Sequence, residues 1–209
     1  MQFATGSHRY AAVPAALAVP VALVSPPVSG LLVVVALAVL FFHRDPDREL
    51  PPSGVVAPAD GRVSVVREEG DRLRVGIYMS GRDVHVNRAP MAGVVEAVDH
   101  VPGANKLAFS KESERNERLR FEFEDYTAEM IAGAFARRTH SYVDAGEFVE
   151  RGQRLGHISF SSRFDVVFPP EYGESDLTVA EGTRVYAGET VIARPNDAVT
   201  VDEAETTAS

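Results

Sequence analysis

The chain of 209 residues contains neither cysteine nor tryptophan, and its only lysines are Lys106 and Lys111. The lack of cysteine excludes disulfide scaffolds, Cys-ligated zinc or iron–sulfur sites and thiol nucleophiles, so any nucleophile must be an oxygen or a nitrogen. The net charge is −9. Because proteins that bind nucleic acid by counterion release need clustered Lys and Arg, we expect no nucleic-acid partner.

Charge is also missing from the N-terminal region. From Tyr10 to Phe42 there are 33 residues without a charged side chain, and all 30 acidic residues come later. Such a segment is typical of a membrane anchor, so we assign residues 1–42 to one. A cleaved signal peptide fits poorly, because the stretch is long and no Ala-x-Ala site follows it.

The anchor contains a break at Pro26-Pro27, which separates Ala11–Val24 from Val28–Phe42. Each half would form a helix of about 22 Å, shorter than a hydrocarbon core of roughly 30 Å. Arginines flank the segment on both sides, which predicts a hairpin with both ends at the cytoplasmic face of the cell membrane. One kinked span or an interfacial anchor are the alternatives.

Residues 43–53 are rich in charge and proline and predict a linker, residues 54–195 a folded domain, and residues 196–209 a flexible tail. The domain reads as mainly β, because short apolar runs alternate with Gly, Pro and Asp, which favours an antiparallel barrel or sandwich. The polar stretch 109–118 predicts an exposed loop or short helix. The expected strands are Val63–Arg67, Leu73–Met79, Gly93–Val98, Leu119–Asp125, Glu129–Ala136, Arg154–Ser159, Phe164–Phe168, Thr183–Val185 and Thr190–Ala193.

Repeated glycine turns, such as Asp60-Gly61 and Arg151-Gly152, are typical of barrel-sandwich hybrid domains like the lipoyl and biotinyl carriers. A carrier, however, displays a lysine at a hairpin tip. Both lysines of this chain lie in the polar stretch, so we disfavour a carrier function.

Three places in the domain could supply chemistry. Asp60 lies at a turn, where an aspartate often only bonds its own backbone. His85 lies in Asp83-Val84-His85-Val86-Asn87, where strand alternation puts the Asp, His and Asn on one face. Histidine is a competent general base near neutral pH when a carboxylate supports it. Ser161-Ser162 lies between two β runs and has no Gly-x-Ser-x-Gly context.

Several motifs, in order and over nearly the whole chain, resemble the short phosphatidylserine decarboxylase proenzymes, including archaeal relatives proposed to act on archaetidylserine. After the hydrophobic hairpin the shared motifs are Phe41-Phe42-His43-Arg44-Asp45-Pro46-Asp47-Arg48, Val56-Ala57-Pro58-Ala59-Asp60-Gly61, Asp83-Val84-His85-Val86-Asn87-Arg88-Ala89-Pro90, Ala136-Arg137-Arg138, and Gly152-Gln153-Arg154-Leu155-Gly156 leading to Phe160-Ser161-Ser162-Arg163.

This resemblance implies an enzyme that cleaves itself between Ser161 and Ser162 and converts Ser162 into a covalent pyruvoyl group. The products would be a large chain and a small chain that stay together as a heterodimer. The pyruvoyl keto carbon would form a Schiff base with the serine amine of a membrane phospholipid and accept electrons as CO2 leaves. No metal is expected, because the six histidines show no paired spacing.

The resemblance also assigns roles to residues. Asp60 and His85 would orient and activate Ser162 for cleavage. Arginines bind phosphate and carboxylate bidentately, so Arg88, Arg137 and Arg138 are candidate partners of the lipid phosphate or the departing carboxylate, with Asn87 a weaker candidate. We interpret His100, His140 and His157 as structural.

The sequence departs from the family pattern at two positions. Ser161 stands where the family usually has glycine, which tolerates strained backbone at a scissile bond. Arg88 stands where longer bacterial members have a second histidine. The main alternative is therefore a processing-defective homologue that acts as a membrane-tethered lipid-binding or scaffolding β domain.

Overall fold

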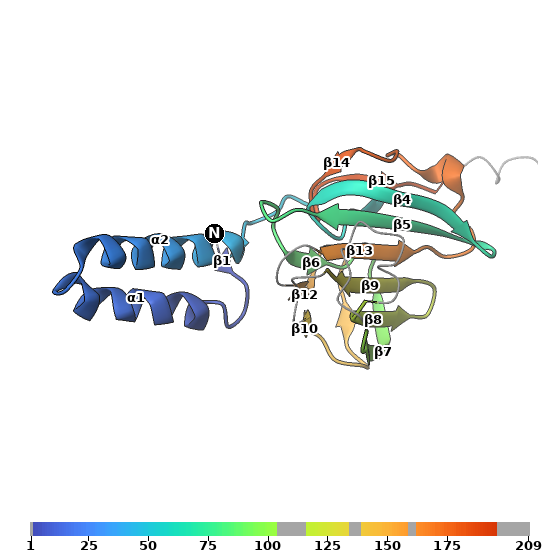
Figure 1. Ribbon diagram of the computed structural model, residues 1–209. Coiled ribbons are helices and arrows are strands. Elements are labelled where there is room, and N and C mark those ends of the chain that lie inside the picture. The colour runs from blue at the N-terminus through green and yellow to red at the C-terminus, as the bar shows by residue number, and fades with distance from the viewer. Residues whose placement is uncertain (1, 104–115, 134–138, 159–161, 196–209) are drawn as a thin grey trace, which may run out of the picture.

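The computed structural model describes residues 2–103, 116–133, 139–158 and 162–195. Two helices at the N-terminus lie side by side and project from a domain made of strands (Figure 1). This arrangement confirms the predicted fold class, a mainly β barrel or sandwich-type domain preceded by a helical hairpin.

The hairpin consists of α1 (His8–Ala22) and α2 (Pro26–Phe42). The two prolines expected to separate the helices instead begin α2, because a residue in the first helical turn does not need its N–H. Small side chains, Ala11, Ala18 and Ala36, are buried, and Ser29 Oγ donates to the Ala18 carbonyl at 2.8 Å. Neither helix is both long enough and apolar enough to cross a membrane, in the ranges that the structure describes.

The β domain is built on a curled antiparallel sheet of eight strands in the order β11-β7-β8-β9-β13-β5-β4-β14. Its strands are β4 (Gly61–Glu69), β5 (Arg72–Met79), β7 (Gly93–Val101), β8 (Arg118–Phe123), β9 (Thr127–Ala132), β11 (Phe148–Val149), β13 (Ser162–Val167) and β14 (Arg184–Val185).

Three smaller sheets complete the structure. One has the order β10-β12-β6, and the others are the pairs β15-β3 and β1-β2. Their strands are β1 (Gln2–Phe3), β2 (Arg44–Asp45), β3 (Val55–Val56), β6 (Val86–Arg88), β10 (Thr139–Ser141), β12 (Arg154–Ile158) and β15 (Val191–Ala193), and a short 3₁₀ turn, η2, covers Glu174–Asp176.

All nine expected strands have a counterpart, with boundaries displaced by a few residues. The largest displacement concerns β9, which begins at Thr127 and ends at Ala132. The sequence prediction began this strand at Glu129. In the structure Glu129 lies inside β9 and is buried and paired with Arg74, so this polar residue does not mark the start of the strand.

Strand β13 holds a central place, because it pairs with β5 on one side and β9 on the other. Alternation along it sends Phe164 and Val166 into the main hydrophobic core, and Arg163 and Asp165 to the opposite face. Ser162, the first residue of β13, lies on the core side and is fully buried.

The segment expected to be a linker lies against the β domain through two buried ion pairs. Asp45 accepts from Arg88 at 2.8 Å, and Arg48 donates to both oxygens of Asp60 at 2.8 and 3.0 Å. The chain between α2 and β3 therefore fixes the foot of the hairpin to the strands that carry the predicted site.

Candidate active site

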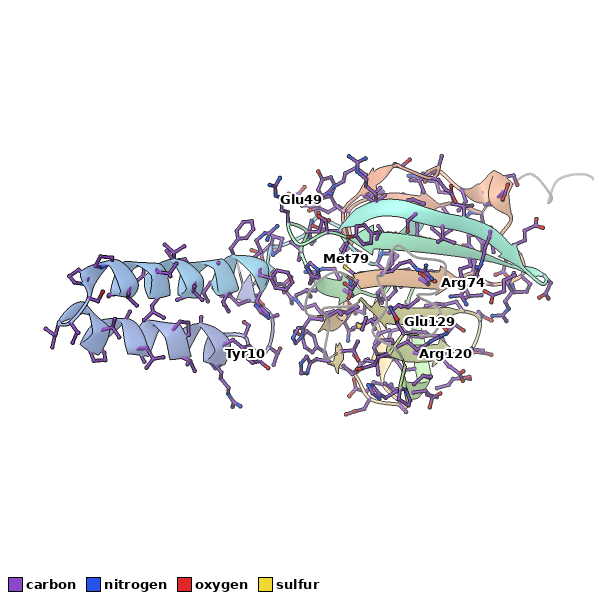
Figure 2. All side chains as sticks on the ribbon, in the orientation of Figure 1. Tyr10, Glu49, Arg74, Met79, Arg120 and Glu129 are labelled. Carbon is purple, nitrogen blue, oxygen red and sulfur yellow. The ribbon has the colours of Figure 1, made fainter. Side chains whose placement is uncertain are left out.

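Ser162 occupies the end of β13 that faces the helical hairpin. Its Cα pairs across the sheet with Met79 of β5 and Ala132 of β9. Among the described residues, its hydroxyl makes one weak hydrogen bond, from Oγ to the Met79 sulfur at 3.9 Å. Figure 2 labels Met79 at this end of the domain. The hydroxyl is thus buried without a strong hydrogen bond, as expected of a group that is available for chemistry.

His85 immediately precedes β6 and is buried. Its Nδ1 lies 2.9 Å from the Asp83 carbonyl, which can only accept, so Nδ1 carries the proton and Nε2 carries the lone pair. Burial lowers the pKa of His85 to about 4. At neutral pH the side chain is therefore uncharged, with a basic nitrogen at Nε2 that has no hydrogen-bond partner among the described residues.

The foot of the hairpin closes over His85. The Phe42 ring at the end of α2 lies 4.3 Å from the His85 ring, measured between centroids. The neighbouring His43 is buried and holds the Val39 carbonyl at 2.9 Å through Nδ1. Since Phe42 ends α2, the helical hairpin and the predicted base are in direct contact.

A cluster of rings extends this contact across β10 and β12. His157 stacks on His140 with centroids 4.5 Å apart, and the Tyr142 hydroxyl lies 2.8 Å from His157 Nδ1. The Thr5 backbone N–H donates to the same hydroxyl at 2.9 Å. Burial lowers the pKa of His157 to about 3. These contacts agree with the structural interpretation of His140 and His157.

Asn87 lies two residues beyond His85 and is fully buried. Its Nδ2 donates to the Met79 sulfur at 3.4 Å, while its Oδ1 has no partner. Asn87 and Ser162 thus contact the same sulfur atom. The Ile158 N–H donates to the His85 carbonyl at 3.2 Å, which ties β6 to the chain shortly before the predicted cleavage site.

Asp60 has partners other than the expected ones. Besides the Arg48 guanidinium, it accepts from the Ala187 backbone N–H at 2.8 Å. The adjacent Gly61 has φ +155°, and a Cβ there would lie 2.1 Å from the Tyr78 carbonyl oxygen, so only glycine fits. No hydrogen bond joins Asp60 to His85 in the described residues, and its role in maturation stays a prediction.

Arg88 is buried and bound within the protein. Besides Asp45, it donates to the Gly152 carbonyl at 3.1 Å. Arg154 also binds Asp45, so one carboxylate joins two guanidinium groups. Burial lowers the pKa of Arg88. If Arg88 contacts a lipid headgroup, as predicted, that contact would form in addition to its hydrogen bonds with Asp45 and Gly152.

Other predicted residues lie outside the described ranges. These are Ser161, Arg137 and Arg138, together with both lysines. His100, at the exposed edge of β7, lies 2.9 Å from Glu117. Among the residues that the structure describes, no group of three His, Asp or Glu side chains could hold a metal ion.

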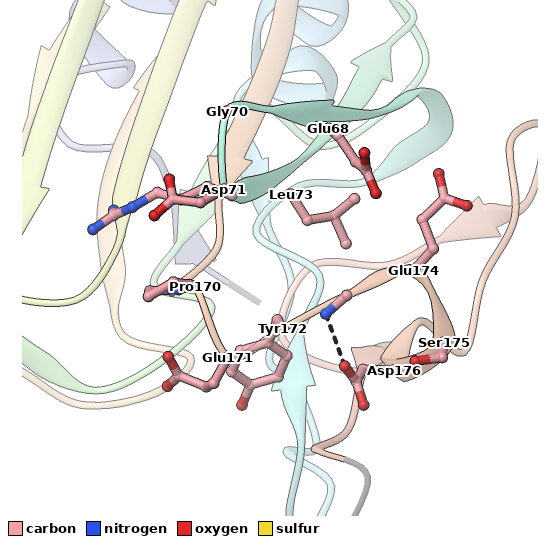
Figure 3. A pocket seen from close by; sticks show the side chains of 12 residues that line it. Glu68, Gly70, Asp71, Leu73, Pro170, Glu171, Tyr172, Glu174, Ser175 and Asp176 are labelled. Carbon is pink, nitrogen blue, oxygen red and sulfur yellow. Dashed lines mark hydrogen bonds between the residues drawn. The ribbon is translucent and has the colours of Figure 1, made fainter.

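A separate hollow lies at the far end of β5 from Met79, around the β4–β5 turn. Figure 3 shows its lining, which includes the acidic side chains of Glu68, Asp71, Glu171 and Glu174. Asp176 accepts there from the Gly173 N–H at 2.8 Å. Because Ser162 pairs with Met79 at the opposite end of β5, this hollow is separate from the candidate active site.

Sequence reasoning assigned no role to Met79, Phe42, Asp45 or Arg48, all of which shape the site. Three of them belong to the Phe41–Arg48 motif, which signalled importance without indicating a contact. Met79 gave no signal at all, because a methionine at the end of an apolar run reads as ordinary core.

Comparison with known proteins identifies the chain. The phosphatidylserine decarboxylase family model matches residues 35–193. An archaetidylserine decarboxylase proenzyme, so named, of Halobacterium salinarum is 54% identical over 187 residues, 89% of this chain and 95% of the relative.

Bacterial relatives are similar as well. The phosphatidylserine decarboxylase proenzyme of Streptomyces coelicolor is 48% identical over 76% of this chain and 74% of its own length. That of Solibacter usitatus is 40% identical over 92% of this chain and 96% of its own length. The chain described above is therefore a decarboxylase that belongs to the phosphatidylserine decarboxylase family.

Proposed function

We propose that this chain cleaves itself between Ser161 and Ser162, converts Ser162 into a pyruvoyl group, and then removes CO2 from the phosphoserine headgroup of a membrane lipid. Relatives named for phosphatidylserine and for archaetidylserine support this substrate class, since the two lipids share one headgroup. The observation that carries the proposal is the buried, weakly bound hydroxyl of Ser162, which shares the Met79 sulfur with Asn87, two residues beyond a histidine whose Nε2 has no partner among the described residues.

Maturation would use atoms of the chain itself. His85 Nε2 is the proposed acceptor of the Ser162 hydroxyl proton. Oγ then attacks the Ser161 carbonyl carbon, the C–N bond breaks, and the freed amine takes a proton, which leaves an ester. Loss of the Ser162 α-proton breaks the Oγ–Cβ bond and releases the Ser161 carboxylate, and water then replaces the nitrogen, which departs as ammonia.

The surroundings of Ser162 suit a pyruvoyl group. The hydroxyl contacts only sulfur, and Ala132 and Met79 flank it across the sheet, so losing the hydroxyl breaks no strong bond. When present, such a group supplies an electrophilic carbonyl that accepts electrons during decarboxylation. Phe42 and His43 cover this end of the domain and would exclude water from it.

The remaining predicted residues have supporting roles in this proposal. Asp60 would be needed for maturation, acting with Arg48 to hold the chain after α2 in place. Arg137 and Arg138 are proposed to bind the lipid phosphate, and the two cleavage products would stay together because β13 is central in the sheet.

We further propose that the hairpin inserts into the cytoplasmic face of the cell membrane. Thirteen of the nineteen exposed large hydrophobic side chains in the described residues belong to it. Water would disfavour this much exposed apolar surface, which indicates contact with lipid. Because the hairpin foot touches His85, insertion would bring the site close to the lipid headgroups.

The membrane proposal can be tested by vesicle flotation. Leu31→Glu places a charge on the hairpin at a residue that is 62% exposed, and we expect less protein to float with the vesicles. Phe148→Glu is a matched control, since Phe148 is 63% exposed on the β domain. Equal flotation of both variants and the wild type would contradict insertion through the hairpin.

The enzymatic proposal is tested with vesicles that contain carboxyl-labelled phosphatidylserine or archaetidylserine. We expect labelled CO2 and the ethanolamine lipid from the wild type, and none from Ser162→Ala. His85→Ala and Asp60→Asn should accumulate uncleaved precursor. A cleaved wild-type chain that releases no CO2 from either lipid would refute the substrate. An uncleaved chain that still binds vesicles would favour the processing-defective alternative.

A further inference from the structure

Two buried hydrogen-bond acceptors project from one short segment and have no partner in the part of the chain that the structure describes. They are Nε2 of His85 and Oδ1 of Asn87, in side chains that are 3% and 0% exposed. Asn87 lies in β6 and His85 directly precedes it, so the strand alternation, continued back by one residue to His85, puts both side chains on the same side of the chain. Unpaired buried acceptors are uncommon in folded proteins and are costly, so their occurrence as a pair calls for a ligand.

The donors of the same side chains are already engaged. The Nδ1–H of His85 points to the Asp83 carbonyl at 2.9 Å, and the Nδ2–H of Asn87 points to the Met79 sulfur at 3.4 Å. These bonds fix the orientation of both groups. The segment therefore offers a ligand two hydrogen-bond acceptors, His85 Nε2 and Asn87 Oδ1.

The position of the pair is also informative. Through the Met79 sulfur, Asn87 is joined to Ser162, which contacts the same atom at 3.9 Å. Phe42 packs on His85 from the other side, at the foot of the hairpin. A ligand bound to both acceptors would therefore lie between the reactive residue and the end of the molecule that we propose to meet the membrane.

The chemistry of the headgroup singles out one of its groups. Phosphate and carboxylate oxygens are acceptors and cannot pair with two bare acceptors. A primary amine carries several N–H donors on one atom and can. We propose that Asn87 Oδ1 and His85 Nε2 accept hydrogen bonds from the primary amine of the lipid headgroup, which makes Asn87 a specificity-determining residue. This inference rests on the function proposed above.

The test measures binding and not turnover. The cleaved wild type is first treated with borohydride, which adds hydride to the keto carbon and a proton to its oxygen, so that amines can no longer be captured covalently. Mass spectrometry of the small chain verifies this step. Calorimetry then compares three short-chain lipids with phosphoethanolamine, phosphocholine or phosphoethanol headgroups. The choline lipid keeps the positive charge but has no N–H donor.

We expect the wild type to bind the ethanolamine lipid about 10-fold or more tightly than the other two, as befits hydrogen bonds to a charged group. Asn87→Leu keeps the branched shape of the side chain, removes the acceptor, and should abolish most of this preference for the ethanolamine lipid. Thr139→Val is a matched control, because it removes another buried and unpaired polar atom, on β10, and should keep the preference.

Asn87→Asp covers the case in which Asn87→Leu fails to fold or to mature, since it retains shape and acceptor oxygens and should retain the preference. A wild type without preference, an unchanged preference in Asn87→Leu, or a loss in folded Asn87→Asp would each overturn the inference. Failure of the proposed function is recognised separately, because a small chain without a keto group would gain no mass with borohydride.

Discussion

The two faces of β13 treat buried polar groups in opposite ways. On the outer face, Arg163 binds Asp165 through Nε and Nη2 at 2.7 and 2.9 Å, and Arg74 binds Asp165 and Glu129 at 3.0 and 2.8 Å. On the core face, within the described ranges, the Ser162 hydroxyl bonds only to the Met79 sulfur, and the nearby His85 and Asn87 each keep one acceptor unpaired.

The outer network is built as a structural element. Arg74 carries three acidic partners, of which Glu69 lies at 2.5 Å, and these partners raise its pKa. Gly76 leaves room for the network, because a Cβ there would lie 2.7 Å from Asp165 Oδ1. Figure 2 labels Arg74 and Glu129 on this part of the sheet, away from the hairpin. These paired charges stabilise a single arrangement of the sheet.

The contrast separates stability from function along one strand. Arg163 and Asp165, on the outer face of β13, belong to the ion-pair network. Ser162, on the core face, belongs to the site with unpaired acceptors. Substitutions on the outer face should therefore change the free energy of unfolding, whereas substitutions on the core face near Ser162 should change chemistry with little effect on stability.

The largest effect is expected at Ser162. Ser162→Ala removes the attacking oxygen, so we expect complete loss of the small chain in mass spectrometry and of CO2 release. The free energy of unfolding should stay within about 1 kcal/mol of the uncleaved wild type, since the hydroxyl makes no strong bond. Appearance of a small chain in this variant would contradict the assignment.

The next largest effect is expected at Asp165, which is fully buried. In the uncleaved Ser162→Ala background, Asp165→Ala should lower the free energy of unfolding by about 3–5 kcal/mol, because it removes the buried carboxylate that pairs with both Arg163 and Arg74. Urea denaturation measures this change. A loss under about 1 kcal/mol would show that the outer network does not hold the sheet.

The buried histidines predict a pH dependence of stability. His85 has a pKa of about 4 and His157 of about 3, both lowered by burial, against an unfolded value of about 6.5. Below about pH 6.5 the two histidines bind protons in the unfolded chain but stay neutral in the folded chain until the pH nears their lowered pKa values. The free energy of unfolding therefore falls as the pH decreases.

Each of the two histidines should contribute a slope of up to about 1.4 kcal/mol per pH unit between pH 6 and 5, a window above most carboxyl pKa values. Urea midpoints of the Ser162→Ala chain at several pH values measure the slope. His157→Gln should reduce it. A stability that is constant over this window would mean that these histidines are not buried in the neutral form.

The smallest effect is expected at Arg120, whose Nε lies 3.3 Å from Glu122 and 3.7 Å from the buried Glu129, with the Arg120 and Glu122 side chains about 40% exposed. Arg120→Ala should cost at most about 1 kcal/mol, because water screens exposed ion pairs. The same urea titration gives the value. A loss as large as that of Asp165→Ala would break the distinction between exposed charges and the buried network.

Much of the fold was accessible from the sequence. The uncharged run from Tyr10 to Phe42 indicated the helices, and alternating apolar residues bounded by Gly and Pro indicated nine strands. These patterns are local, and burial acts on them directly. The short strands β1, β2, β3, β10 and β11 lacked such a pattern, because long-range pairing alone defines them.

The candidate site was predictable only in part. Ser162, His85, Asn87 and Asp60 were singled out from motifs; Ser162 and Asn87 both contact the Met79 sulfur, and His85 lies two residues before Asn87. The partner of Asp60 was not foreseen, because Arg48 lies in a segment that composition marks as a linker. Tertiary contacts of this kind leave no trace in periodicity.

Intact-mass spectrometry of the purified full-length protein tests the central claim most directly, because self-cleavage changes the covalent structure. The account predicts two chains, Met1–Ser161 and a Ser162–Ser209 fragment whose first residue is a pyruvoyl group. A single uncleaved chain of 209 residues from native membranes would contradict it.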